Sequence, residues 1–318
     1  MTLTELRYAV ALAREKHFGR AAAACFVSQP TLSVAIRKLE SELGVTLFER
    51  SMQDVHVTPV GEQVVAQAQQ VLSQVSAIKD MVVQGRDPLN GPLHIGVIYS
   101  IAPYLLPNLM AHMFKTHPQM PLIVQEQYTH NLLEWIKQGK LDAAILALPI
   151  ADSGLAVEPL YDESFFVTMP QSHPLAKKAH ITSHELRKES LLVLGAGHCF
   201  REHVLEATPD ASLYKVEEDG LQRNFEGSSL ETLRYMAAAG IGITVLPALA
   251  VPKHEQDDNL AYVPLIHGKK TDAHVPHRRI VLIWRKNFSR EAACHGLAQA
   301  VRDCGLHGVQ WLPALTEE

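Results

Sequence analysis

Short apolar runs alternate with amphipathic segments from residue 93 to residue 148, and this order constrains the fold more than any other feature of the chain. The apolar runs at 93–98, 122–126 and 141–148 predict strands, and the segments 103–114 and 131–137 between them predict helices. Strands that alternate with helices form a mostly parallel sheet with helices on both faces. We therefore expect a domain of the α/β class.

A second α/β lobe is expected from the later part of the chain, because the same alternation returns there. Its elements, in chain order, are a strand at 160–169, a strand at 191–194, a helix that begins at Cys199, a helix at 230–239 and a strand at 243–246. A strand at 280–284 and a helix at about 290–304 return to the first lobe. Two such lobes place a ligand cleft at the strand ends between them.

The segment 191–208, LLVLGAGHCFREHVLEAT, contains the strongest candidate for chemistry. An apolar run stops at a Gly-Ala-Gly turn, and an amphipathic segment then begins with Cys199. The first turn of a helix has unpaired N–H groups and the positive end of the dipole, and both favour a thiolate. His198 and Arg201 add donors or positive charge. The alternative is an inert, buried cysteine that serves as a small hydrophobe, and position alone leaves both interpretations open.

Composition limits the class of protein. A chain of 318 residues with 47% hydrophobic and 20% charged residues is typical of a globular protein of two or three domains. The net charge of −5 argues against a protein that coats nucleic acid. Residues 1–60, however, hold seven Lys or Arg against six Asp or Glu, which permits DNA binding by a small N-terminal module.

The cysteines and the N-terminus indicate the compartment. Four cysteines (Cys25, Cys199, Cys294, Cys304) lack CxxC spacing, so we expect no disulfide framework, no metal site and no cofactor. Charged residues interrupt the N-terminal apolar pattern, so no signal peptide is expected, and no apolar run has the length of a membrane span. We therefore expect the reducing cytoplasm.

Helix signals in the first 60 residues predict a winged helix-turn-helix. After a helix from Thr4 and a short helix at about 19–25, Ser28 fits an N-cap and Gly44 a helix end, so a long helix should lie between them. Two short strands at 47–50 and 55–59 form the wing. The side chains suited to base edges are Gln29, Pro30, Thr31 and Ser33, and those suited to phosphate are Arg37, Lys38 and Arg50. A three-helix packing unit without a ligand is the alternative.

The next helix, from Pro59 to about Gly85, is expected to pair two subunits. Its apolar positions recur at spacings of four and three residues, which is the heptad pattern of a narrow seam between two helices. These positions are Val64, Ala68, Val71, Val75, Ile78 and Val82. A dimer would present two DNA-binding units to a two-fold DNA site.

The run FGRAAAACFVSQPTLSVAIRKLESELGVTLFERS, followed by TPVGE, resembles the winged helix-turn-helix of the LysR-type transcriptional regulators, and the remaining chain fits their layout. The resemblance implies a DNA-binding domain at 1–58, a linker helix at 59–87 and a regulatory domain at 88–318. Within the last, it implies lobe I at about 88–162 and 269–318 and lobe II at about 163–268, with a periplasmic-binding-protein-like fold. Implied partners are promoter DNA, RNA polymerase and further copies of the chain, as a dimer through the linker helix and as a tetramer.

Two further motifs, GAGHCFREHVLEA and SSLETLRYMAAAGIGITVLP, resemble the hydrogen-peroxide sensors of this family. By that resemblance Cys199 is the peroxidatic thiol. Ser100 in VIYS and Thr129 in QYTH would lie with His198 around the peroxide, and Arg278 in HRRI would help hold the thiolate. Ser100 replaces the family's threonine and keeps its hydroxyl.

The chain departs from the sensor pattern at Thr208, where that pattern has a second cysteine nine residues after the first. We expect a peroxide-responsive transcription regulator rather than a multiple-turnover enzyme. Two other interpretations stay open: a metabolite-sensing LysR regulator in which Cys199 is structural, and a thiol-dependent enzyme.

Overall fold

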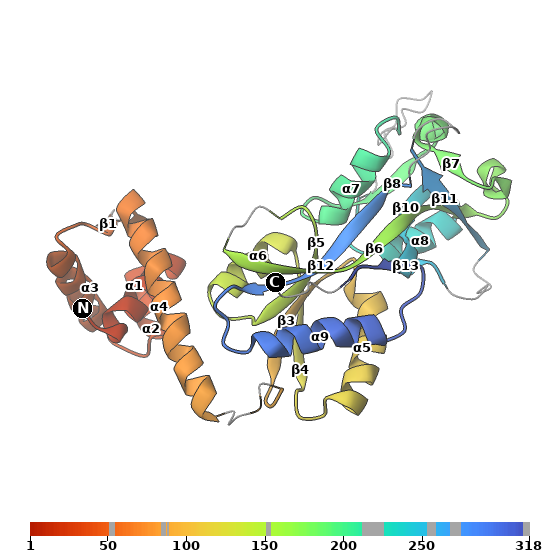
Figure 1. Cartoon of the computed structure of the whole chain (residues 1–318). Coiled ribbons are helices and arrows are strands. Elements are labelled where there is room, and N and C mark those ends of the chain that lie inside the picture. The colour runs from red at the N-terminus through yellow and green to blue at the C-terminus, as the bar shows by residue number, and fades with distance from the viewer. Residues whose placement is uncertain are drawn as a thin grey trace. The chain divides into compact units, whose positions relative to one another are not determined.

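The computed structural model describes residues 1–50, 55–83, 87, 89–150, 154–211, 226–252, 259–267 and 275–313. The chain divides into a compact N-terminal unit that ends at Asp87 and a larger unit that holds nearly all of the remainder. Figure 1 labels the helices and strands of both units. No helix in the described ranges combines the length and the apolar character that a membrane span requires.

The N-terminal unit is the expected winged helix-turn-helix. It contains α1 (Leu3–Glu15), α2 (Phe18–Ala24) and α3 (Gln29–Leu43), followed by an antiparallel wing of β1 (Phe48–Arg50) and β2 (Val55–Val57). The Ser28 hydroxyl accepts a hydrogen bond from the Thr31 N–H at the start of α3, and Gly44 ends this helix at a φ of 69°. Both predicted helix ends are therefore confirmed.

The helix α4 (Pro59–Val83) begins where the sequence places it, because the Thr58 hydroxyl accepts a hydrogen bond from the Gly61 N–H. The first half of α4 packs on the N-terminal unit. Ala68 is 2% exposed and belongs to the hydrophobic core of that unit, and Val64 and Val71 pack against this core. Further along, Ile78 is 61% exposed. The side chain of Val82, like that of Arg50, lies outside the described residues.

Lobe I of the larger unit is built on a sheet with the strand order β4, β3, β5, β12. The strands β3 (Leu93–Ile98), β4 (Leu122–Gln127) and β5 (Ala143–Ala147) are parallel, and β12 (His277–Arg285) is antiparallel to β5. The helices α5 (Ala102–Thr116) and α9 (Glu291–Asp303) lie side by side on one face, and α6 (Thr129–Lys137) covers the other (Figure 1).

One long strand, β6 (Leu155–Pro170), belongs to both lobes. Its first part pairs with β12 and with β13 (Val309–Trp311), and its second part pairs with β10 (Ile243–Pro247) and β11 (Leu260–Ile266), always antiparallel. The expected mostly parallel sheet is therefore found only within each lobe. The strand β6 runs from lobe I to lobe II and β12 runs back, so the two strands are antiparallel where they pair.

Lobe II contains the remaining elements around a second core. The strand β8 (Leu191–Leu194) is parallel to β10 and to β9 (Glu226–Gly227), and β7 (Ile181–Thr182) is parallel to β11. The helices α7 (Cys199–Ala207) and α8 (Leu230–Ala238) pack on this sheet. Short 3-10 helices lie at Pro174–Lys177, Ser183–Lys188 and Ala248–Ala250.

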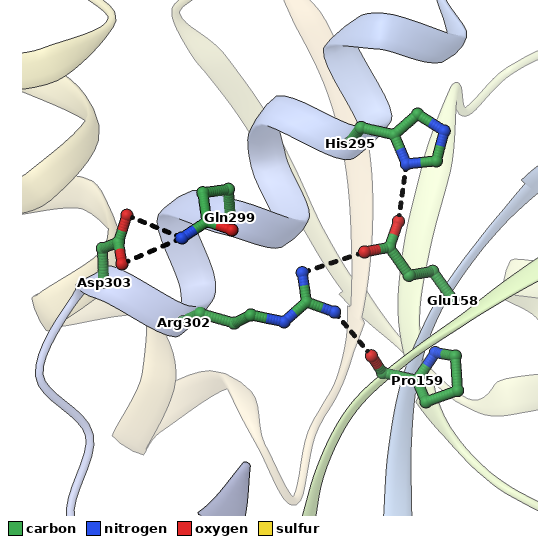
Figure 2. A network of polar contacts seen from close by, with 6 residues as sticks. All are labelled: Glu158, Pro159, His295, Gln299, Arg302 and Asp303. Carbon is green, nitrogen blue, oxygen red and sulfur yellow. Dashed lines mark hydrogen bonds and ion pairs between the residues drawn. The ribbon is translucent and has the colours of Figure 1, made fainter. Parts of the chain in front are cut away.

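A buried ionic network joins α9 to the shared strand β6 (Figure 2). The Glu158 side chain, on a residue that is 2% exposed, accepts hydrogen bonds from His295 Nδ1 at 2.8 Å and from Arg302 at 2.9 Å. Arg302 also donates to the Pro159 carbonyl at 2.8 Å. The network fixes the C-terminal helix on the part of β6 that lies in lobe I.

Candidate functional site

The turn before α7 explains why Cys199 lies at a helix start. The buried strand β8 ends at Leu194, and Gly197 then adopts a φ of +95°, a region that L side chains rarely adopt. His198 occupies the N-cap without a capping hydrogen bond from its side chain, and Cys199 is the first helical residue. The thiol therefore lies beside backbone N–H groups that no capping side chain satisfies.

Three helix N-termini meet at one small cavity in front of this thiol. Ser100 directly precedes Ile101, the N-cap of α5, Thr129 opens α6 and Cys199 opens α7. The cavity is lined by Ile98, Tyr99, Ser100, Gln127, Tyr128, Thr129, Gly197, His198 and Cys199. Four of the residues that the sequence singled out are thus brought together, and the three helix dipoles favour negative charge there.

The size of the cavity limits the ligand. It offers about 10 Å³ to the centre of a water-sized molecule, which is the space that about one water requires. Drug-sized ligands occupy pockets of roughly 300–1,000 Å³. A molecule about the size of water fits this site, whereas a drug-sized metabolite does not.

Thr129 presents an unsatisfied hydroxyl to this region. Its Oγ1 is buried and has no hydrogen-bond partner among the described residues. A buried hydroxyl without a protein partner is unfavourable, so this hydroxyl favours a polar ligand in the cavity. The second hydroxyl, that of Ser100, belongs to a residue that is 4% exposed and lies on the same cavity.

His198 lies among aromatic rings. The Tyr128 ring meets it edge-on with centroids 4.9 Å apart, and the Tyr99 centroid is 5.9 Å away. Burial lowers the pKa of His198 below its ordinary value of about 6.5. The imidazole is therefore neutral at pH 7, and it can donate or accept a hydrogen bond but adds no positive charge.

Arg278 reaches the site through Ser100. This residue is 2% exposed, and its guanidinium donates to the Ser100 hydroxyl at 2.7 Å and to the Ser100 carbonyl at 3.2 Å. Its Nε donates to Glu163 Oε1 at 2.8 Å, and the guanidinium carbon lies 4.6 Å from the centroid of the Phe200 ring. Arg278 therefore contacts the cavity through the Ser100 hydroxyl, which belongs to its lining. It also lies against Phe200, the residue that follows Cys199.

Glu163, Tyr128 and Phe200 are part of this arrangement, and sequence reasoning missed all three. The sequence held one signal for Glu163, because a charged residue within the strand-like run 160–169 would be buried and would need a partner. Tyr128 and Phe200 offered none beyond their positions next to Thr129 and Cys199.

Thr208 closes the other end of α7. It is the C-cap residue, it is 2% exposed, and its hydroxyl donates to the Val204 carbonyl at 2.6 Å. All four cysteines are free thiols. Burial raises the pKa of Cys25 and Cys294, and it raises that of Cys304 to about 11, so these three thiols are poor nucleophiles at neutral pH.

The N-terminal unit exposes the start of α3. Gln29, Pro30 and Thr31 are exposed and Ser33 is half-buried. Of the basic residues further along α3, Arg37 is exposed, whereas Lys38 is paired with Glu5 at 2.9 Å. In the part of the chain that the structure describes, no three His, Cys, Asp or Glu side chains are arranged to hold a metal ion.

Comparisons with known proteins agree with this architecture. Residues 3–62 match the family described as "Bacterial regulatory helix-turn-helix protein, lysR family", and residues 86–304 match the LysR substrate binding domain. The chain is 41% identical over 302 residues to the "DNA-binding transcriptional dual regulator OxyR" of Escherichia coli, which covers 95% of each protein.

Solved structures give the same result over the whole chain. A full-length OxyR variant from Pseudomonas aeruginosa matches with 45% identity and a TM-score of 0.75, which covers 100% of this chain and 99% of that one. A Corynebacterium glutamicum OxyR variant with hydrogen peroxide bound matches with 32% identity and a TM-score of 0.61, which covers 95% and 92%. The chain belongs to the LysR family of bacterial transcriptional regulators, within its OxyR group.

Proposed function

We propose that Cys199 is the peroxidatic thiol of a regulator that senses hydrogen peroxide and controls antioxidant genes. The observation that carries this proposal is the convergence of Cys199, Ser100, Thr129 and His198 on one cavity of about 10 Å³, which admits only a very small ligand. The bound peroxide of the C. glutamicum OxyR structure supports the same ligand here. A metabolite would need a larger pocket than the one in front of Cys199, which disfavours a metabolite at that thiol.

The site supplies each part of the reaction. The Cys199 thiolate attacks one peroxide oxygen, so that an S–O bond forms, the O–O bond breaks and hydroxide leaves with the electron pair. The proton that the Cys199 thiol lost on ionising returns to this hydroxide through a neighbouring donor, which gives water. Ser100, Thr129 and neutral His198 line the cavity and can donate to the leaving oxygen. The products are a cysteine sulfenic acid and water.

Thr208 determines the fate of the sulfenic acid, because its side chain has no thiol that could capture this group as a disulfide. We propose that oxidised Cys199 persists as sulfenic acid, is oxidised further, or forms a mixed disulfide with a small thiol. The change of charge and shape at the start of α7 is then the signal. This chemistry is stoichiometric, so the protein acts as a sensor and not as a multiple-turnover enzyme.

The N-terminal unit and α4 serve transcription in the cytoplasm. Gln29, Pro30, Thr31 and Ser33 face base edges of promoter DNA, and Arg37, Lys38 and Arg50 face phosphates. Two copies pair through α4, and two such dimers form a tetramer that works with RNA polymerase. Of the predicted seam residues, Val64, Ala68 and Val71 pack in or against the core of the N-terminal unit. The contacts between copies therefore lie mainly at Val75, Ile78 and Val82. The exposure of Ile78, at 61%, supports a partner on the second half of this helix.

Rapid mixing with hydrogen peroxide tests the proposed site. Replacing Thr129 with Ala should slow the oxidation of Cys199 at least about tenfold, since a general donor contributes roughly 10²–10⁴-fold in such reactions. Thr129→Ser keeps the hydroxyl and should retain most of the rate. Equal rates in Thr129→Ala and the unsubstituted protein would exclude this hydroxyl from the reaction.

A further inference from the structure

We infer that Glu163 is a positioning residue for peroxide reduction, because it aims Arg278 at the Ser100 hydroxyl. Glu163 lies on β6, is 1% exposed and does not line the cavity. This inference rests on the proposed role of the cavity and adds to it a residue that acts from outside.

Both carboxylate oxygens of Glu163 accept a hydrogen bond. Its Oε1 accepts from Arg278 Nε at 2.8 Å, and its Oε2 accepts from the Leu249 backbone N–H at 3.2 Å. Both partners can only donate. A carboxamide at this position would turn an NH₂ group toward one of these donors, so Glu163→Gln breaks one contact while it keeps the size of the side chain.

These contacts fix the plane of the Arg278 guanidinium. Glu163 holds its Nε edge, and the Phe200 ring lies 4.6 Å from its central carbon. The two terminal nitrogens are then directed at Ser100, one at its hydroxyl at 2.7 Å and one at its carbonyl at 3.2 Å. A planar guanidinium that is held at one edge has little freedom at the other.

The direction of the Ser100 proton is set by this geometry. Because the Ser100 oxygen accepts a charge-assisted hydrogen bond from Arg278, its own hydrogen must point away from the guanidinium. Ser100 also lines the cavity with Cys199. The hydroxyl therefore acts as a donor toward the cavity, where the leaving oxygen of peroxide needs one. Glu163 sets this direction through Arg278, without touching the reactants.

The test is the rate of Cys199 oxidation by hydrogen peroxide in the full chain, measured by rapid mixing over a range of pH. In the plateau, the pH range in which the oxidation rate no longer rises with pH, Glu163→Gln should be slower by about tenfold or more, as expected when a catalytic donor is displaced. Ser100→Ala should be slower by a similar factor. The double variant should be no slower than Ser100→Ala, because Glu163 acts only through that hydroxyl.

Glu158→Gln is the matched control. Glu158 lies on the same strand, is 2% exposed and pairs with Arg302 at 2.9 Å and with His295 at 2.8 Å (Figure 2). Unlike Arg278, these two partners have no described hydrogen bond to a residue of the cavity lining. It should lower the thermal stability of the protein and leave the plateau rate unchanged. A second variant, Glu163→Asp, keeps the negative charge beside Arg278 but shortens the side chain, and it should also lower the plateau, even where Glu163→Gln fails to fold.

Three results bear on the inference. A plateau within twofold of the unsubstituted protein in both Glu163 variants overturns it. A double variant whose rate loss is the product of the two single losses also overturns it, because Glu163 would then act by another route. If Cys199 of the unsubstituted protein reacts no faster than free cysteine, the proposed function fails instead, and this outcome is seen before any variant is made.

Discussion

Cys199 and Thr208 lie at opposite ends of one helix, the first at the start of α7 and the second at its C-cap. Nine residues of helix separate their Cα atoms by about 13 Å, whereas a disulfide needs roughly 4.4–6.8 Å. A cysteine at position 208 could therefore pair with Cys199 only after α7 unwinds.

This separation gives a prediction about Thr208→Cys. After peroxide treatment the variant should form a disulfide between Cys199 and the new thiol, with loss of α7 helix, because both ends of the segment are drawn together. A peptide map under non-reducing conditions detects the bond, and amide hydrogen exchange of residues 199–208 detects the unwinding. Thr208→Ser is the control and should show neither change. If the amides of α7 stay protected from hydrogen exchange after the disulfide has formed, the account is contradicted.

A prediction for DNA binding concerns Arg37, which is exposed on α3. Arg37→Ala should weaken binding to any sequence and reduce the slope of log K against log salt by about 0.9, the loss of one phosphate contact. Thr31→Ala, at the start of the same helix, should instead reduce discrimination between sequences. Fluorescence anisotropy over a salt series measures both, and an unchanged slope for Arg37→Ala removes this residue from the interface.

The α4 pairing can be tested at Val75 and Ile78. Aspartate at both positions would bury unpaired charge in the intersubunit seam, which costs several kcal/mol per ion, and should convert dimers to monomers in sedimentation. Both positions come after Val71, the last of the predicted seam residues that pack against the core of the N-terminal unit. The melting of that unit should therefore be unaffected. Sedimentation that matches the unsubstituted protein would refute the pairing.

Phe26 carries a prediction for stability. It lies after α2 with a φ of 56° and is 95% exposed. The neighbouring backbone hydrogen bonds run from the Phe26 N–H to the Ala23 carbonyl and from the Val27 N–H to the Ala22 carbonyl. This is the left-handed C-terminal position where glycine is favoured. Phe26→Gly should raise the free energy of unfolding by about 0.5–1 kcal/mol. Ala23→Gly, within the helix, should lower it by about 1 kcal/mol. Chemical denaturation measures both, and a loss of stability in Phe26→Gly would contradict the argument.

Two buried histidines predict a pH dependence. Burial lowers the pKa of His198 and His203 in the folded state, and His203 also bonds the Leu148 carbonyl at 2.8 Å. The unfolded chain then binds more protons than the folded chain just below pH 6.5, so stability is fully present above about pH 6.5 and falls as the pH drops toward the folded values. His203→Gln should reduce this slope in denaturation measured from pH 7 to pH 5. The exposed His184→Gln should not.

Local signals in the sequence were sufficient for most elements. Ser28, Gly44 and Thr58 act through their own neighbouring backbone, so the ends of α3 and the start of α4 could be predicted from the residues alone. Cys199 opens α7 as the Gly-Ala-Gly turn indicates. The strands β11 and β13 were not predicted, because β11 contains Pro264 and β13 has three residues, so neither gives a clear pattern.

The cavity could not be predicted from local signals, because its walls come from three distant segments. Ser100 and Thr129 were expected there only through the family resemblance, and the structure places both beside Cys199. Nothing in the sequence near Arg278 indicates that it bonds Ser100 across 178 residues. Glu163 was missed because its role depends on its hydrogen bond to Arg278. The two residues are opposite each other only because β6 pairs with β12.

The most direct test of the central claim is the state of Cys199 after one equivalent of hydrogen peroxide. The protein is trapped with a reagent for sulfenic acid, digested without reduction and analysed by mass spectrometry. We predict one added oxygen, or its trapped adduct, on the peptide that contains Cys199, while Cys25, Cys294 and Cys304 stay reduced. A reduced Cys199, or a disulfide from Cys199 to one of the other three cysteines of the same chain, would contradict the account.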